Sequence, residues 1–496
     1  MRLTLGVALL SLGALLGVLT PLPTTITPQK GRDEWTVPAK IFEGSGSIRE
    51  PALVADSSGT LHAFWVYSEV GSPTMIYYAR WDGSAWTQPV DVFIASGVVQ
   101  GPSAVVDNLG HIHLLWQGPG NTLYYSSAHV DEAGSASGWN WPKFIATANP
   151  HGDIEADYAG TLYIVYPSVE DEGIYFTISS DGGKTWSTPA LVAKPNNPGA
   201  TTDFARLAIS PKGDLHVVWT ELQLPTGYPP LGVFYARSSD GGNSWSRPVQ
   251  IAGNGYLEIN VIAFRDEVHI AWNGMASISG RYHRWSGDRG LTWSNTYQIA
   301  APSFGGGSTG PPGLAVDSSG VVHAVVNTVD TVPHNEPGPF GATLYSSWIG
   351  TVWLTPTNIS SAAPGYSSMN NEESVIATVK GNQLHVLFLG DGTKTLWHTY
   401  IWTAAPQTPP RTFRPSSAGT SPTSPTKETS PIPLPTKTPE AATPTISVSD
   451  TSIDTPADRT LGQTNTALLL GVLPALLFVC AVFLLTIYAQ RLRRRI

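Results

Sequence analysis

Residues 215–219 read LHVVW, and this short strand pattern recurs six more times along the chain. Each copy has an apolar residue, then His or Tyr, and closes on an aromatic residue or valine. The copies stand about fifty residues apart, which is the spacing of one supersecondary unit in a repeat protein. The sequence therefore predicts seven units. Their marker strands are LHAFW (61–65), IHLLW (112–116), LYIVY (162–166), LHVVW (215–219), VHIAW (268–272), VHAVV (322–326) and LHVLF (384–388).

Each unit carries signals for four short antiparallel strands. An apolar strand ends in a turn before the marker strand, as in PALVADSSGT (51–60), and an aromatic strand follows it, as in IYYAR (76–80). The fourth strand begins with W-x-x-P. Four strands per repeat is typical of a propeller blade, so we expect an all-β, seven-bladed β-propeller of four-stranded blades over residues 34–403. The motif stands at Trp86–Pro89, Trp139–Pro142, Trp186–Pro189, Trp245–Pro248 and Trp353–Pro356.

The seventh unit lacks a fourth strand, and a matching motif stands at the other end of the propeller region. Trp35-Thr36-Val37-Pro38 fits W-x-x-P in phase. We therefore expect residues 35–42 to form the outer strand of the last blade, beside the strand near Leu396–Trp402. Such closure removes the open sheet edges through which β-proteins aggregate.

The two ends of the chain predict a cell-surface protein. Residues 1–24 have a charged start and a short apolar core, the layout of a signal peptide or a signal anchor. Residues 404–465 are rich in Pro, Thr and Ser, which predicts a disordered stalk. Residues 466–490 predict a transmembrane helix, and the basic tail at 491–496 marks its cytoplasmic side. We expect a single-pass cell-membrane protein with its head and N-terminus outside and its C-terminus in the cytoplasm.

Composition disfavours two features. The formal net charge of −9 disfavours nucleic acid as a partner, because phosphate binding requires a basic surface. The one cysteine, Cys480, leaves no disulfide framework within a monomer. Only 13% of the residues are charged, whereas Gly, Pro, Trp and Tyr are plentiful. That mixture suits short strands and tight turns around an aromatic interior.

A tighter motif, S-x-D-x-G-x-[TS]-W, links the third and fourth strands of three consecutive units. It reads SSDGGKTW (179–186), SSDGGNSW (238–245) and SGDRGLTW (286–293). The motif resembles the Asp-box, or BNR repeat, of the sialidase superfamily, and the resemblance covers the propeller region. We expect structural roles, in which the aspartate accepts N–H groups of its own turn and the tryptophan packs between blades. These residues are Asp181, Trp186, Asp240, Trp245, Asp288 and Trp293.

The histidines of the marker strands are interpreted in the same way, as bonds between strands. Equivalent positions repeated around a ring rarely all take part in chemistry. We therefore predict no metal site among them, and no cofactor.

Propeller ligands bind where the central channel opens, at the loops before the first strands and between the second and third strands. In this sequence those loops are mostly acidic. We expect a carbohydrate or protein ligand there, and the sequence does not indicate an oligomeric state. Their polar residues are Arg49, Glu50, Glu69, Gln100, Asp153, Glu155, Glu170, Asp171, Glu172, Asp203, Glu221, Tyr256, Glu258, Arg281, Asp330, His334, Glu336, Tyr366, Glu372 and Glu373.

The resemblance to sialidases implies specific candidates. In that superfamily three arginines hold the sugar carboxylate, a Tyr activated by a Glu is the nucleophile, and an Asp is the acid/base. Arg49 stands in an R-x-P context that the superfamily shares, and a guanidinium suits a carboxylate. The candidates are Arg49, Arg206 and Arg281 for substrate binding, and Tyr256 with Glu221 or Glu258 for the nucleophile pair.

Two departures from the superfamily favour binding over catalysis. The superfamily enzymes have six blades where this sequence predicts seven, and an acidic mouth repels an anionic sugar. The first hypothesis is a surface-anchored module that binds glycan or protein. The second is an exo-glycosidase of the exo-α-sialidase type, which convergence of the three arginines in one pocket would favour. The third is a structural or assembly factor of the cell envelope.

Overall fold

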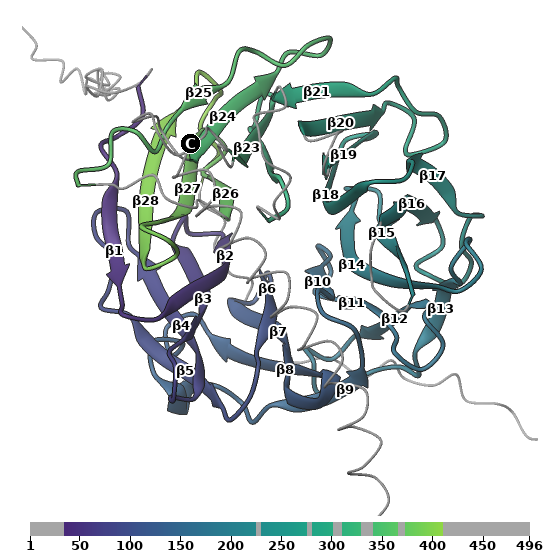
Figure 1. Cartoon of the computed structure of the whole chain (residues 1–496), viewed down its shortest axis with the longest axis horizontal. Helices are drawn as coiled ribbons and strands as arrows, with labels where there is room; N and C mark the ends of the chain where they lie inside the picture. The colour runs from purple at the N-terminus through teal and green to yellow at the C-terminus, as the bar shows by residue number, and fades with distance from the viewer. Residues whose placement is uncertain are drawn as a thin grey trace, which may run out of the picture. The chain divides into compact units, whose positions relative to one another are not determined.

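The computed structural model describes residues 34–224, 230–274, 280–300, 310–328, 341–365 and 373–409. These residues form seven four-stranded antiparallel sheets around a central axis (Figure 1). The predicted all-β, seven-bladed propeller is confirmed. The predicted signal sequence, most of the stalk, the membrane helix and the basic tail lie outside the described residues.

Each of the first six blades is formed by four consecutive strands, with the first strand nearest the axis. Blade 1 contains β2 (Ser47–Ala55), β3 (Leu61–Ser68), β4 (Thr74–Trp81) and β5 (Val90–Ala95). Blade 2 contains β6 (Gln100–Val106), β7 (His111–Gly118), β8 (Thr122–His129) and β9 (Lys143–Thr147), with the short 3₁₀ helices η1 (Pro119–Asn121) and η2 (Ala136–Gly138). Blade 3 contains β10 (Asp153–Ala156), β11 (Leu162–Pro167), β12 (Ile174–Ser179) and β13 (Ala190–Ala193). Blade 4 contains β14 (Ala200–Ile209), β15 (Leu215–Gln223), β16 (Pro230–Ser238) and β17 (Val249–Ala252). Blade 5 contains β18 (Tyr256–Phe264), β19 (Glu267–Gly274), β20 (Gly280–Ser286) and β21 (Tyr297–Ala300). Blade 6 contains β22 (Gly313–Val316), β23 (Val322–Thr328), β24 (Ala342–Trp348) and β25 (Thr357–Asn358).

The seventh blade combines both ends of the propeller. Its sheet has the order β1-β28-β27-β26, with β1 (Ala39–Glu43) as the outer strand. The other three strands are β26 (Ser374–Val379), β27 (Gln383–Gly390) and β28 (Thr395–Trp402). This is the pairing that the phase of the N-terminal W-x-x-P motif predicts.

The closing strand is shorter than the predicted 35–42. Its ladder with β28 begins at Ala39, directly after Pro38, which has no N–H to donate. Upstream, the Thr36 N–H still donates to the Tyr400 carbonyl at 3.0 Å. The Trp35 ring packs edge-on against Tyr345 of blade 6 with centroids 4.9 Å apart. The N-terminal segment therefore joins blade 7 and also contacts its neighbour.

The hydrophobic core is divided into clusters that lie between successive blades. Within β15, Val217 and Trp219 pack toward blade 3, whereas Val218 between them packs toward blade 5. A strand buried on both faces needs apolar residues at successive positions. This explains why the marker strands, apart from the His or Tyr at their second position, are apolar at successive positions.

The marker histidines link the second strand of a blade to the third. His62 Nδ1 lies 2.8 Å from the Tyr78 hydroxyl, and His113 makes the same contact with Tyr125 at 2.7 Å. In blade 7 the partner is a second histidine, His398, at 3.0 Å from His385. These contacts are the interstrand bonds that the sequence predicts.

The Asp-box turns satisfy their own backbone. In blade 4, Asp240 accepts the Ser244 N–H at 2.9 Å, the Ser244 hydroxyl at 2.6 Å and the Ser238 hydroxyl at 2.7 Å. These hydrogen bonds lower the pKa of Asp240 to about 2. The Trp245 ring that follows packs edge-on against Phe176 of blade 3, with centroids 5.4 Å apart.

The other two Asp-boxes repeat this arrangement. Asp181 binds Thr185 and Asp288 binds Thr292, each carboxylate accepting both the N–H and the hydroxyl. Their tryptophans pack against the third strand of the preceding blade, with ring centroids 5.1 Å apart for Trp186–Tyr125 and 4.9 Å for Trp293–Tyr235.

The chain leaves the propeller on the face formed by the turns that follow the first strands. Near this exit the Thr408 N–H donates to the Lys380 carbonyl at 2.8 Å, and the Ser318 hydroxyl donates to the Pro406 carbonyl. Both Lys380 and Ser318 belong to turns at the ends of first strands. We call this the turn face, and the opposite face, where the first strands begin, the mouth face.

Candidate functional site

In blades 1 to 6 a residue with left-handed backbone lies within the first strand or just before it, at equivalent places. The antiparallel register breaks in β2, β6, β14 and β18 at these places. A positive φ is costly for a residue with a Cβ, on the order of 1–3 kcal/mol, and such strain clusters at functional sites. The residues concerned, with φ between 50° and 71°, are Glu50, Gly101, His151, Phe204, Glu258 and Gly310.

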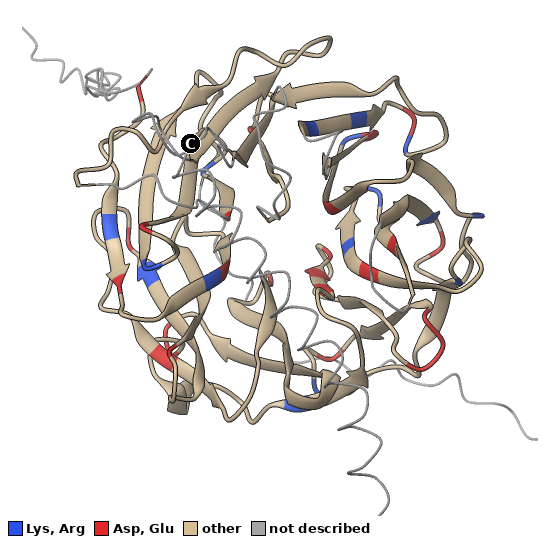
Figure 2. Cartoon of the chain, viewed as in Figure 1, with Lys and Arg blue, Asp and Glu red and all other residues tan. Residues whose placement is uncertain are grey.

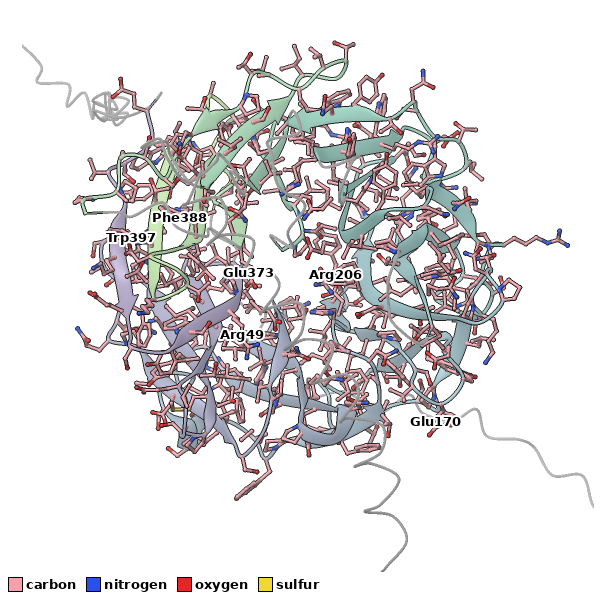
Figure 3. All side chains as sticks on the ribbon, in the orientation of Figure 1. Arg49, Glu170, Arg206, Glu373, Phe388 and Trp397 are labelled. Atoms are coloured by element: carbon pink, nitrogen blue, oxygen red, sulfur yellow. The ribbon has the colours of Figure 1, made fainter. Side chains whose placement is uncertain are left out.

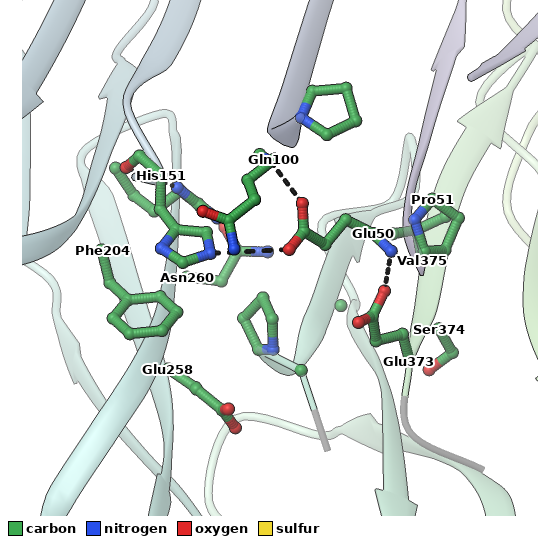
Figure 4. Close-up of a pocket in the computed structure, with 16 residues that line it drawn as sticks. Glu50, Pro51, Gln100, His151, Phe204, Glu258, Asn260, Glu373, Ser374 and Val375 are labelled. Atoms are coloured by element: carbon green, nitrogen blue, oxygen red, sulfur yellow. Dashed lines mark hydrogen bonds and ion pairs between the residues drawn. The ribbon is translucent and has the colours of Figure 1, made fainter. Parts of the chain in front are cut away.

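These interruptions surround an axial pocket on the mouth face, with a volume of about 280 Å³. Every blade contributes to its wall, and its side chains include carboxylates, amides, one imidazole, one guanidinium and one phenyl ring (Figure 4). The lining residues are Glu50, Pro51, Gln100, Gly101, Pro102, His151, Phe204, Arg206, Glu258, Asn260, Gly310, Pro311, Gly313, Glu373, Ser374 and Val375.

His151 is held at the pocket wall between two carboxylates. Its Nδ1 lies 3.1 Å from Asp203 Oδ1, and its Nε2 lies 3.9 Å from Glu50 Oε1. The imidazole stacks on the Phe204 ring, with centroids 4.2 Å apart and planes 6° from parallel. Burial alone would lower the pKa of His151, but Asp203 and Glu50 outweigh it and raise the pKa to about 9. At neutral pH the wall therefore presents an imidazolium ion.

Glu50 ties three blades together at the mouth. Its carboxylate accepts the N–H of Gly101 in blade 2, and its own N–H donates to Glu373 of blade 7 (Figure 4). Burial opposes ionisation of Glu50, but the bond to His151 prevails and lowers its pKa. The carboxylate is therefore ionised and fixed in direction before any ligand arrives.

Arg206 is partly occupied by the protein itself. Its Nη1 donates to the His151 carbonyl at 3.1 Å and to the Ala205 carbonyl at 3.0 Å. Arg206 and Glu373 lie on opposite sides of the central opening (Figure 3). The guanidinium therefore braces the His151 segment from blade 4 as well as lining the pocket.

Acidic residues also occur on innermost strands such as β10 and β14 (Figure 2). Asp153 of β10 accepts the Ser103 hydroxyl at 2.5 Å and the Leu207 N–H at 2.9 Å, so it bonds to the blades on both sides. Burial, and next the Asp153 carboxylate, raise the pKa of Glu155 to about 8. The axis is thus predominantly acidic, as the loop composition predicts.

The three candidate arginines do not line one pocket in the described structure. Arg206 lines the axial pocket, whereas Arg49 lies beside Glu50 on β2 and is not part of the lining. Arg281 of β20 is buried and donates to the carbonyls of Gly280 at 3.0 Å and Asn327 at 2.6 Å. The convergence that would favour an exo-sialidase is therefore not found among these residues.

Of the candidate nucleophile residues Tyr256, Glu221 and Glu258, Glu258 alone lines the axial pocket. Tyr256 packs edge-on against Trp272 and Tyr282 and does not line the pocket. Glu258 does line it, and it accepts the Asn273 side-chain amide at 2.6 Å. The described residues that line the pocket include no tyrosine.

Glu221 is fully buried and serves the loop that leads into blade 4. Its carboxylate accepts the N–H and side-chain amide of Asn196, at 2.7 and 2.9 Å, and those of Asn197, at 3.0 and 2.7 Å. Four donors use the acceptor capacity of both oxygens. This geometry gives Glu221 a positioning role in the loop.

His151 and Phe204 are pocket residues that the sequence reasoning missed. Both stand where Glu50 stands in blade 1, at the left-handed position of the first strand. Aligning the units on their marker strands would have placed them there. Neither is a conspicuous residue in a loop, which is why attention to acidic and basic side chains passed over them.

The described ranges contain neither a cluster of metal-binding side chains nor a helix that could span a membrane. No group of three or more His, Cys, Asp and Glu side chains in those ranges is arranged to hold a metal ion. No helix in the same part of the chain is long and apolar enough to cross a membrane.

Comparison with known proteins identifies the repeat and the fold. The model of the BNR repeat-like domain matches residues 24–255. No curated protein matches the chain.

Among solved structures, three illustrate the likeness. The BP39L lectin from Burkholderia pseudomallei is 13% identical, covering 76% of this chain and 100% of its own, with a TM-score of 0.51. An ulvan lyase bound to GlcA(1-4)Rha3S is 11% identical, covering 74% and 95%, with a TM-score of 0.51. The K499G mutant of the NanB sialidase from Streptococcus pneumoniae is 15% identical, covering 73% of this chain and 70% of its own, with a TM-score of 0.40. At these identities the likeness shows the propeller fold alone.

Proposed function

We propose, because this chain is a sialidase-like β-propeller built from BNR repeats, that it binds carbohydrate in the axial pocket without cleaving it. The observation that carries the proposal is the pocket wall itself, where the carboxylates of three glutamates share the lining with the stacked pair of His151 and Phe204. Carboxylates accept hydrogen bonds from sugar hydroxyls, and an aromatic face packs against the C–H face of a sugar ring. Among the structural neighbours, one is a lectin and another is a polysaccharide lyase bound to GlcA(1-4)Rha3S, which supports the same ligand class.

The pocket is organised before a ligand arrives. The Glu50 carboxylate is held by the Gly101 N–H. The Glu373 carboxylate is held in turn by the Glu50 N–H. A site that need not order its side chains on binding keeps more of its interaction energy as affinity. Its volume of about 280 Å³ lies near the lower end of ligand pockets, which suits a terminal sugar better than a long chain.

Charge favours a neutral or amino sugar. The lining holds the carboxylates of Glu50, Glu258 and Glu373 against Arg206 and protonated His151. His151 is already paired with carboxylates, and Arg206 with backbone carbonyls. A sialic acid or uronate would bring another negative charge into this acidic mouth and be repelled.

Display at the cell surface is part of the same proposal. The chain leaves the propeller on the turn face, where Thr408 bonds Lys380, and the axial pocket opens on the mouth face. A membrane helix at 466–490 would anchor the head through the segment that follows this exit. Proteolysis of intact cells should release the head if this topology holds, and protection until lysis would contradict it.

The binding proposal is tested with the full chain on an array of neutral, amino and sialylated glycans. Glu50→Gly and Phe204→Gly both keep the left-handed backbone, since glycine adopts it freely and stands at this place in blade 2 as Gly101. Each should weaken the strongest neutral or amino-sugar signal by about tenfold or more, because a charge-assisted bond or a ring contact is lost.

Glu172→Gly is the matched control, because Glu172 also has φ of 60° but lies outside the pocket. It should bind as the unaltered chain does. Binding confined to sialylated glycans, or release of free sugar from a sialic-acid reporter, would replace the proposal by the exo-glycosidase. No binding to any glycan would leave the envelope assembly role.

A further inference from the structure

A second hollow lies on the mouth-face side of the junction between blades 1 and 2, away from the axis. We call it the outer groove. It has a volume of about 420 Å³ and is lined by four aromatic rings, those of Phe93, Trp116, Tyr124 and Trp141. The remaining lining residues carry no charge; they are Ile94, Ala95, Ser96, Val99, Gly118, Pro119 and Pro142.

Trp141 is out of place for a residue that only supports the blade. It occupies the third position of the W-x-x-P motif, where the other full copies have Val37, Gln88, Thr188, Arg247 and Thr355. Its side chain is 91% exposed, although tryptophan normally buries a large apolar surface. Five other blades have the full motif without an aromatic residue at this position, so packing of the blade does not explain Trp141.

The rings beneath Trp141 form a continuous aromatic wall. Phe93 stacks on Trp116 with centroids 4.4 Å apart and planes 29° from parallel. Trp116 in turn stacks on Tyr124 at 5.9 Å and 27°. Gly118 permits this arrangement, because a Cβ there would lie 2.7 Å from the Tyr124 ring.

The corresponding groove between blades 2 and 3 is built differently. It also has a stacked pair, Tyr166 and Tyr175, with centroids 6.1 Å apart. However, Lys194 lies 5.9 Å over the Tyr175 ring and pairs with Asp171, so a cation takes the place of a ligand there. Its motif position holds Thr188 in place of tryptophan. The two grooves share their framework, and only the outer groove leaves its aromatic wall uncharged.

We propose that the outer groove is a second carbohydrate site, in which Trp141 and the wall of Phe93, Trp116 and Tyr124 hold an uncharged pyranose ring between aromatic faces. A stacked sugar presents its C–H face to a ring and needs no ion pair, which agrees with the uncharged lining. The volume falls within the roughly 300–1,000 Å³ of small-ligand sites, whereas a stable protein partner needs about 800 Å² of surface on each side.

This site would act independently of the axial pocket and shares with the proposed function only the class of ligand. The two sites have no lining residue in common. A head with two sites could engage two sugars of one glycan chain or surface and so bind more tightly than either site alone.

The test measures, by calorimetric titration, the affinity of the full chain for three neutral oligosaccharides: cellohexaose, mannohexaose and chitohexaose. Trp141→Thr introduces the residue that two other blades use, so the blade should fold. It should weaken the binding of at least one oligosaccharide by about tenfold or more, since the exposed ring is one face of the site. Leu291→Thr removes a 62% exposed apolar side chain from another link between third and fourth strands, and it should have no effect.

The axial variant Phe204→Gly, at a position in blade 4, separates this inference from the proposed function. We expect it to leave the Trp141-dependent binding intact. Loss of binding at one site can therefore be told apart from loss of binding at the other. The outer-groove proposal is overturned if none of the three oligosaccharides binds, if all bind Trp141→Thr as tightly as the unaltered chain, or if Trp141→Thr instead abolishes sedimentation with phosphatidylcholine vesicles.

Discussion

Phe42 should be the side chain through which the N-terminal strand keeps the ring closed. Its backbone belongs to β1, which pairs with β28 in blade 7. Its ring packs against three aromatic residues of blade 1: Trp65 at 5.5 Å, Tyr67 at 5.4 Å and Tyr77 at 5.1 Å between centroids. One side chain therefore spans the junction between the last blade and the first. We predict that Phe42→Ala will weaken this junction.

The expected loss follows from burial and ring contacts. Truncating a fully buried Phe to Ala costs about 3–5 kcal/mol. Phe42 is only partly buried, which reduces this contribution to about half. Each aromatic pair adds about 0.5 kcal/mol or more beyond the area buried. The free energy of unfolding should therefore fall by about 3 kcal/mol, a large part of the roughly 5–15 kcal/mol that holds a domain folded.

The measurement is urea unfolding of the full chain, followed by far-ultraviolet circular dichroism. Val37→Ala is the matched control, because Val37 belongs to the same N-terminal segment but is 68% exposed. It should change the free energy of unfolding by less than about 0.5 kcal/mol. An equally small effect of Phe42→Ala would refute the idea that this strand closes the ring through Phe42.

Three further predictions concern buried charges and pH. Glu221→Ala should lower the free energy of unfolding by about 3 kcal/mol, because four donors of the preceding loop lose a buried acceptor, while glycan binding by the folded fraction stays unchanged. The pKa of His151 is raised to about 9, so its protonation contributes fully to the stability of the fold below pH 6.5. This contribution should be lost as pH rises through 9. Urea unfolding of His151→Asn between pH 6 and 10 should show no such loss of stability. Burial lowers the pKa of His216 to about 3, so its contribution is full above pH 6.5 and falls as pH drops toward 3; acid unfolding that is equally steep in His216→Gln would contradict this.

The ring could be predicted because its signals are local and repeated. Each marker strand is apolar on both faces, each turn carries its own Asp or Gly, and the W-x-x-P motif at Trp35 keeps the phase of the other blades. A repeat lets weak local signals add up, since each unit must bury its faces against the next. The acidic mouth was also visible, since Glu50, Gln100, Glu258 and Glu373 stand in loops that a propeller directs to its axis.

The membership of the pocket was decided only by the tertiary structure. Arg49 and Glu50 are neighbours in sequence, yet Glu50 lines the pocket and Arg49 does not. The cause is the left-handed residue at position 50, where the register of β2 breaks, because a shift of one residue turns a side chain to the other face of a strand. The stacking of His151 on Phe204 likewise joins two blades whose contact no local pattern encodes. The sequence by itself determined the number of blades and the strand that closes them, while the direction of each mouth side chain depends on bulges that neighbouring blades hold in place.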